Sequence, residues 1–200
     1  MVAIVDYGVG NLHSVRKAFA YIGQKAEITS DADVIRNADH VLLPGVGAFY
    51  DARMRLKETG MEEAVREAVI SGKPTLGICL GMQLLFENSL ENGDHKGLGL
   101  LQGSVVPFTG QLKVPHMGWN SLTFHGGSPL FRGLKDGDHV YFVHSYHVPF
   151  LNEAGFMGAT ADYGVPFVAA IQKENLFATQ FHPEKSGEVG LTMLKNFAAI

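Results

Sequence analysis

The sequence has 200 residues and a mass of 21.7 kDa, and its 46% hydrophobic and 18% charged residues exclude a disordered chain and favour one domain. A formal net charge of −4 excludes a basic surface suited mainly to nucleic acid or anionic membranes. The chain opens on an apolar strand rather than a signal peptide and has no membrane-length apolar run, so we expect a cytoplasmic protein. It contains one cysteine, Cys79, so we expect no internal disulfide.

Short apolar runs alternate with amphipathic segments in the first half of the chain. The predicted strands are residues 2–6, 25–29, 40–43 and 75–78. The predicted helices are residues 11–22, 31–37, 48–56, 61–71 and 80–87. Within 61–71, for example, Met61, Ala64, Val65 and Ala68 recur at helical spacing. This alternation of strands and helices indicates a parallel sheet that is covered on both faces.

The second half changes character from Gly103 onward, where strand-like segments are separated by turns. We expect strands at residues 104–107, 121–124, 139–148, 156–161, 167–172 and 176–182, and a closing helix at residues 187–199. The sequence therefore predicts an α/β fold, with a mostly parallel open sheet flanked by helices and an added antiparallel portion, in a single domain of residues 1–200.

One segment has the pattern of a nucleophile. In Gly77-Ile78-Cys79-Leu80-Gly81, a buried strand meets a helix at a cysteine with a glycine two residues to either side. This is the cysteine form of the strand–turn–helix elbow, in which small flanking residues allow the tight turn. The helix N-terminus favours the thiolate, and the N–H of Leu80 would face a developing oxyanion. A buried structural cysteine is the alternative interpretation.

A thiolate nucleophile needs a base, and the base needs an orienting group. His182 and Glu184 follow a predicted strand and are separated by Pro183. We expect the chain to be extended here, so that both side chains project from the same side and the carboxylate orients the imidazole. Read alone, the pair would be a surface contact at a strand end; paired with Cys79, it becomes a candidate base and its partner.

A second strand end offers a donor for an oxyanion. Pro44-Gly45-Val46-Gly47 closes the predicted strand 40–43 in the same relation to the sheet as Cys79. The two glycines permit a positive φ, which would aim the N–H of Val46 or Gly47 outward. A plain strand-to-helix turn is the alternative.

Two other signals are rejected. Gly8-Val9-Gly10 begins like a dinucleotide-binding loop, but His13 stands where the third glycine belongs. His144 and His147 suggest a metal cluster, but three residues apart in one strand they would face opposite sides. We therefore expect no metal and no nucleotide cofactor.

The segment 115–120 contains Trp119, the only tryptophan. Pro115 and Gly118 favour an exposed loop over a strand. Because tryptophan is enriched where interfaces need a rigid anchor, we interpret Trp119 as an interface residue rather than a core residue.

Together these residues resemble the triad (class I) glutamine amidotransferases. The resemblance rests on residues 77–83 and on Gln180-Phe181-His182-Pro183-Glu184. More narrowly, the chain resembles the glutaminase subunits of that family that serve histidine biosynthesis. The blocks that carry this narrower match lie at residues 6–11, 44–49, 115–120, 141–146 and 182–186.

The resemblance implies a role for each candidate residue. Cys79 would attack the side-chain amide of glutamine, with His182 as base and Glu184 orienting it, to give glutamate and ammonia. The oxyanion would be held by backbone N–H groups of Val46, Gly47 and Leu80. The amino-acid end of glutamine would be bound by Gln83 and by the backbone of Ser145 and Tyr146.

The resemblance also implies a partner, a cyclase subunit with a (β/α)₈-barrel fold that forms a heterodimer with this chain. Ammonia would pass through that barrel and yield imidazole glycerol phosphate and an aminoimidazole carboxamide ribotide. The positions that match the partner-facing surface are Asn11, Met117, Trp119, Asn120, Tyr141 and Lys185.

Three alternatives remain. A self-sufficient cysteine hydrolase would act on peptides or small amides, although tight glycine turns leave little room for a polymer. A glutaminase subunit could serve another pathway, such as anthranilate or vitamin B6 synthesis, although Trp119 and its neighbours argue against this. A non-catalytic binding subunit would have no need of Cys79, His182 and Glu184 together.

Overall fold

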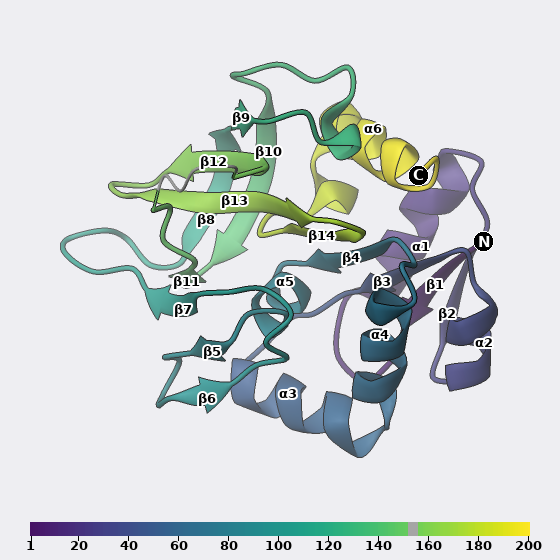
Figure 1. Cartoon of the computed structure of the whole chain (residues 1–200). Coiled ribbons are helices and arrows are strands. Elements are labelled where there is room, and N and C mark those ends of the chain that lie inside the picture. The colour runs from purple at the N-terminus through teal and green to yellow at the C-terminus, as the bar shows by residue number, and fades with distance from the viewer. Residues whose placement is uncertain (152–155) are drawn as a thin grey trace.

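The centre of the molecule is an eight-stranded sheet, shown in Figure 1. The structure is a computed structural model, and it describes residues 1–151 and 156–200. The strand order is β2-β1-β3-β4-β14-β13-β12-β9. The first five strands are parallel and the last three run antiparallel. Their bounds are β1 Val2–Val5, β2 Ala26–Thr29, β3 His40–Leu43, β4 Thr75–Ile78, β9 Thr123–His125, β12 Gly158–Asp162, β13 Pro166–Lys173 and β14 Leu176–Thr179.

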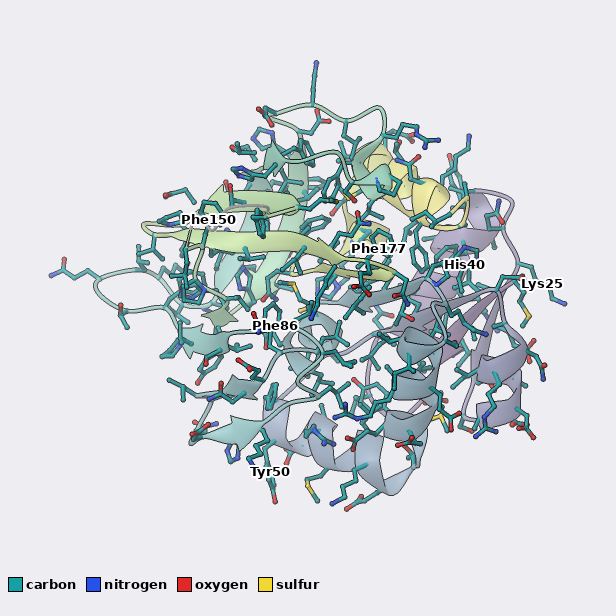
Figure 2. All side chains as sticks on the ribbon, in the orientation of Figure 1. Lys25, His40, Tyr50, Phe86, Phe150 and Phe177 are labelled. Carbon is teal, nitrogen blue, oxygen red and sulfur yellow. The ribbon has the colours of Figure 1, made fainter. Side chains whose placement is uncertain are left out.

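Successive residues of the inner strands enter two separate hydrophobic cores. On β1, Ala3 and Val5 join one core, while Val2 and Ile4 join the other. This period of two with apolar residues on both sides is expected of a parallel sheet buried between helical layers. In Figure 2, Phe177 of β14 lies in the interior, where it is fully buried. The predicted α/β fold class is confirmed.

Within the described residues, six helices cover the two faces of this sheet (Figure 1). Helices α2 to α5 pack with the core of Ala3, and α1 and α6 contact each other over the core of Val2. α2 begins after Asp31, whose carboxylate accepts a hydrogen bond from the Asp33 N–H and so caps the helix. The bounds are α1 Leu12–Tyr21, α2 Ala32–Asn37, α3 Phe49–Glu58, α4 Met61–Ile70, α5 Leu80–Leu84 and α6 Gly187–Phe197.

Two smaller sheets complete the strands of the described residues. One pairs β8 with β10, and the other has the order β11-β7-β5-β6. Short 3₁₀ turns stand at η1 Pro129–Phe131 and η2 Pro183–Lys185. The strands are β5 Asn88–Ser89, β6 His95–Lys96, β7 Ser104–Pro107, β8 His116–Ser121, β10 His139–His144 and β11 Tyr146–His147.

Several predicted boundaries are wrong because long-range pairing decided them. Segment 115–120, expected as an exposed loop, contains most of β8, which pairs residue by residue with β10. Gly118 has a φ of +135° opposite Phe142, so the glycine tolerates an irregular position inside the strand. The predicted strand 139–148 divides at Ser145 into strands of two different sheets.

Other elements end earlier than expected. The helix predicted at 80–87 stops at Leu84, and the strand predicted at 176–182 stops at Thr179. The strand predicted at 121–124 straddles the end of β8 and the start of β9. In the described part of the chain, no helix is both long and apolar enough to cross a membrane.

The parallel strands β3, β4 and β14 are neighbours, and their carboxyl ends meet at one edge of the sheet. In open α/β sheets, ligands bind in the crevice outside this edge. The loops that follow these three strands carry Val46, Cys79 and His182.

Candidate active site

Cys79 occupies the sharp turn between β4 and α5 that the sequence predicts. Its φ of 54° and ψ of −111° are rare for a residue with a side chain, and such strain persists only where the surroundings impose it. A Cβ added to Gly81 would lie 2.0 Å from the Leu43 carbonyl oxygen, and one on Gly77 would lie 2.9 Å from the Gly81 oxygen. The two flanking glycines therefore let the backbones pack closely and hold Cys79 in the turn.

His182 and Glu184 are in direct contact. His182 Nδ1 lies 2.8 Å from Glu184 Oε1, and the two side chains are only 3% and 1% exposed. The expected extended geometry is wrong, because Pro183–Lys185 forms a 3₁₀ turn after His182. Proline fixes its own φ near the helical value, which suits the first position of such a turn. The turn, rather than the alternation of a strand, brings the carboxylate back to the ring.

The charge balance at His182 favours an imidazolium. Burial lowers the pKa of His182, but interactions with Cys79 and with the Glu184 carboxylate outweigh burial, so its pKa lies above the ordinary value. With Nδ1 turned to Glu184, Nε2 is the ring nitrogen left for chemistry. Nε2 is buried and has no hydrogen-bond partner among the described residues. His182 can therefore exchange a proton with a group that enters beside Cys79.

A cavity of about 420 Å³ joins most of the predicted site. Its walls include these residues predicted from the sequence: Val46, Gly47, Cys79, Leu80, Gln83, Ser145, Tyr146, His182 and Lys185. Glu184 lies behind His182 and does not line the cavity. The volume suits a small molecule of amino-acid size better than a polymer.

The proposed oxyanion loop packs directly on the elbow. A Cβ added to Gly45 would lie 2.7 Å from the Gly81 nitrogen, and Gly47 has a φ of +98°. The Tyr7 hydroxyl donates a 2.7 Å hydrogen bond to the Pro44 carbonyl and fixes the base of the loop. Burial, together with the nearby Cys79, raises the pKa of Tyr7, so this hydroxyl keeps its proton. The loop is thereby positioned beside the thiol.

Gln83 is held on the cavity wall by two acceptors. Its Nε2 donates to the Tyr146 carbonyl at 3.1 Å and to Gln180 Oε1 at 2.9 Å. Its Oε1 is therefore the end of the amide that is left to accept a hydrogen bond from a ligand. Gln83 and Tyr146, to which the resemblance assigns the binding of glutamine, therefore contact each other on the cavity wall.

Sequence reasoning missed two residues of the site. Glu91 lines the cavity, and its Oε2 accepts a 2.7 Å hydrogen bond from the Phe49 N–H. It follows β5, a strand that the sequence did not predict, and no local pattern marks it. Gln180 is fully buried and its Nε2 lies 3.8 Å from Cys79 Sγ. Its signal was its place in the block Gln180-Phe181-His182-Pro183-Glu184, which carries the family resemblance but gave Gln180 no role.

The structure divides the predicted partner-facing residues between two faces of β8. Met117 and Trp119 are 61% and 56% exposed on one face, and Tyr141 stands opposite Trp119 in β10 with its ring centroid 6.0 Å away. Asn120 points to the other face, where its Nδ2 donates to the Asp162 carbonyl at 2.8 Å. Asn11 and Lys185 are exposed, and Lys185 also lines the active-site cavity.

The sequence predicts that His144 and His147 share one strand, where residues three apart face opposite sides and could not hold one metal. This prediction is wrong. The two residues belong to different strands, and both imidazoles lie against the Phe108 ring, at centroid distances of 5.3 and 4.2 Å. His144 Nδ1 donates to the Tyr146 carbonyl at 2.8 Å, and its Nε2 lies 2.9 Å from His116 Nδ1. Across the described residues, no group of three or more metal-ligating side chains comes together.

Comparison with known proteins places the chain among amidotransferases. The family described as glutamine amidotransferase class-I matches residues 3–200. Imidazole glycerol phosphate synthase subunit HisH of Caldanaerobacter subterraneus is 54% identical over 197 residues, covering 98% of this chain and 97% of that protein. The subunit of the same name from Wolinella succinogenes is 50% identical over 205 residues, covering 100% of both.

Solved structures agree in fold. A crystal structure of glutamine amidotransferase matches with a TM-score of 0.76 and 21% identity, covering 100% of both chains. The structure of PurLQS from Thermotoga maritima matches with a TM-score of 0.74 and 19% identity, covering 98% of this chain and 96% of that chain.

Proposed function

Because this chain belongs to the class I glutamine amidotransferase family, we propose that Cys79, His182 and Glu184 hydrolyse the side-chain amide of glutamine. The chain is a glutamine amidotransferase and acts in histidine biosynthesis as the glutaminase subunit of an imidazole glycerol phosphate synthase. Full-length identity near 50% supports this pathway over the other amidotransferases that the sequence left open. One observation carries the assignment of residues: the strained Cys79 shares a cavity with a histidine that is held by a buried carboxylate.

In the first half of the reaction, the Cys79 thiolate attacks the side-chain carbonyl carbon of glutamine. The new C–S bond moves the carbonyl electron pair onto oxygen, and N–H groups of Leu80 and of the Val46–Gly47 loop donate hydrogen bonds to this oxyanion. The His182 imidazolium gives its Nε2 proton to the amide nitrogen, the C–N bond breaks, and ammonia leaves. A thioester on Cys79 remains.

In the second half, neutral His182 takes a proton from water at Nε2. The resulting hydroxide attacks the thioester carbon, the C–S bond breaks to restore the thiolate, and the new carboxylic acid gives its proton to solvent as glutamate leaves. Glu184 stays ionised throughout, because its role is to hold the ring by Nδ1 and to stabilise the imidazolium. The 2.8 Å contact between Nδ1 and Oε1 supports this role.

The amino-acid end of glutamine needs acceptors for its ammonium and donors for its carboxylate. We assign the ammonium to the Glu91 carboxylate and to Gln83 Oε1, which both belong to residues of the cavity wall. Backbone groups of Ser145 and Tyr146 bind the rest of the zwitterion. A cavity whose wall carries both charge-assisted contacts and a thiol favours a small zwitterion with a side-chain amide.

The names of the relatives describe subunits, which supports a partner for this chain as well. We assign the partner, a cyclase subunit with a (β/α)₈-barrel fold, to the face of β8 and β10 that exposes Met117 and Trp119. Pro115 lines the active-site cavity and lies two residues before Met117, so the proposed docking face continues directly from the site of ammonia release. Residues 1–200 would act as one amidotransferase domain in this heterodimer.

The experiment that tests these assignments compares wild type with Cys79→Ala in complex with the cyclase subunit. With glutamine as nitrogen donor, Cys79→Ala should form no product, whereas with ammonium salts it should retain most of the wild-type rate. A diazoketone analogue of glutamine, which alkylates a thiol with loss of N₂, should add its mass less that of N₂ to the wild-type chain only. Loss of both activities in a variant that still binds the partner would refute the assignment of Cys79.

A further inference from the structure

The side chain of Gln180 lies against the nucleophile, yet the mechanism above makes no use of it. Gln180 comes directly after β14, and the neighbouring Cys79 N–H donates to the Thr179 carbonyl at 2.7 Å. The residue is 0% exposed, and its Nε2 lies 3.8 Å from Cys79 Sγ. A buried carboxamide in this position is therefore part of the environment of the thiol.

The hydrogen-bond donors and acceptors around Gln180 determine which end of its amide faces the sulfur. A backbone carbonyl can only accept, so the Gln83 amide must turn its NH₂ group toward the Tyr146 oxygen. The second hydrogen of that NH₂ group then points at Gln180, which must present its oxygen, at 2.9 Å. If the Gln180 amide were reversed, its NH₂ group would face the NH₂ group of Gln83, and two donors would lie opposite each other. Its NH₂ group is thereby directed at Cys79 Sγ.

Two titratable groups also face the thiol: the His182 imidazole, which when protonated favours the thiolate, and the Tyr7 hydroxyl. A further polar neighbour of the sulfur has the opposite preference to the Gln180 NH₂ group. The Val143 carbonyl oxygen lies 4.0 Å from Sγ, where it can accept from a thiol but repels a thiolate. We propose that Gln180 is a hydrogen-bond donor that stabilises the Cys79 thiolate and links the nucleophile through Gln83 to the glutamine-binding wall. This inference deepens the proposed function, and it rests on Cys79 being the nucleophile.

The hydrogen bond between Gln83 and Gln180 couples the binding of substrate to the state of the thiol. Gln83 meets both Tyr146 and Gln180, so the group assigned to bind the substrate and the group that supports the thiolate are joined by one hydrogen bond. Rotation of the Gln180 amide is blocked as long as Gln83 remains in place. Removing either partner should therefore affect the thiol in the same direction.

The test titrates the thiol itself. Because Cys79 is the only cysteine, the rate of alkylation by iodoacetamide as a function of pH reports its ionisation in the free chain. Gln180→Met keeps similar length and removes the donor, and we expect the alkylation midpoint to rise by about one pH unit, or roughly tenfold slower alkylation below it. Gln180→Glu keeps the acceptor for Gln83 but places an oxygen at the sulfur, and should raise the midpoint further.

Two further variants complete the experiment. Gln24→Met, at an exposed site, is the matched control and should leave the midpoint unchanged. Gln83→Met, which frees the Gln180 amide, should raise the midpoint by less than Gln180→Met, and the double variant should show less than the sum. Circular dichroism identifies folded proteins, and Gln180→Glu decides the matter if Gln180→Met does not fold.

The possible failures are distinguishable. An unchanged midpoint in a folded Gln180 variant overturns the inference, even if glutamine hydrolysis falls, because a purely structural role would lower activity without moving the thiol titration. Hydrolysis by Cys79→Ala would instead overturn the proposed function, whatever the thiol titration shows.

Discussion

The exposed ring of Trp119 allows the proposed docking face to be tested with one substitution, Trp119→Ala. The side chain is 56% exposed on β8, and its buried part rests on Tyr141. An aromatic side chain of this size can bury up to ~250 Å², so a partner could cover roughly 140 Å² more. At about 25 cal/mol per Å², loss of that burial costs roughly 3.5 kcal/mol of binding free energy. Allowing for imperfect packing, we expect a loss of at least ~2 kcal/mol, or roughly a 30-fold weaker Kd.

The folding stability of the free chain should respond differently. A core tryptophan replaced by alanine costs about 3–5 kcal/mol, whereas a half-exposed one should cost about 1 kcal/mol. For a domain of this size, that is a fall in Tm of roughly 2–4 °C. Calorimetric titration against the cyclase subunit gives Kd, and thermal unfolding of the free chain gives Tm.

Tyr50→Ala is the matched control. Tyr50 is 49% exposed and packs on His95, and it points outward from α3, on a part of the molecule distant from β8 and β10 (Figures 1 and 2). It should lose a similar small amount of stability and no partner affinity. A large fall in Tm with unchanged Kd for Trp119→Ala, or equal loss of affinity in both variants, would refute the docking face.

Three further outcomes are expected. Glu184→Gln should slow glutamine hydrolysis less than His182→Ala, because the carboxylate only orients the ring that moves the proton; equal losses in steady-state rates of folded variants would contradict this. Glu91→Gln should raise KM for glutamine about tenfold with a smaller change in kcat, since it removes the charge assigned to the ammonium, and a fall in kcat at constant KM would argue for another role. Burial lowers the pKa of His144 from 6.5 to about 3, so between these pH values the unfolded chain binds more protons than the folded one. The free energy of unfolding should therefore fall as pH drops through this window, by at most ~1.4 kcal/mol per pH unit from this group. Urea unfolding of His144→Gln should show a shallower pH dependence than wild type, and identical slopes would exclude this contribution.

The sequence by itself determined the features that depend on neighbouring residues. Glycines two residues on either side of Cys79 predicted an elbow, and the structure shows Gly81 in contact with the Leu43 backbone. Apolar runs of strand length predicted the parallel half of the sheet, because such runs can only be buried on both faces. His182 and Glu184 were paired correctly from their spacing, although the turn at Pro183 and not an extended chain brings them together.

Only the tertiary structure decided which residues surround the thiol and line the cavity, and that residues 116–121 form the strand β8 paired with β10. Glu91 reaches the cavity from 42 residues beyond Phe49, its hydrogen-bond partner, and Gln180 meets Cys79 across 101 residues. No local pattern encodes such distances. Likewise, Gly118 and the preceding Pro115 favour a loop by propensity, but the ladder to β10 makes this segment a strand and turns Asn120 away from Trp119. Local preferences are worth about 1 kcal/mol at each residue, and cross-strand pairing and burial, summed along the strand, exceed them.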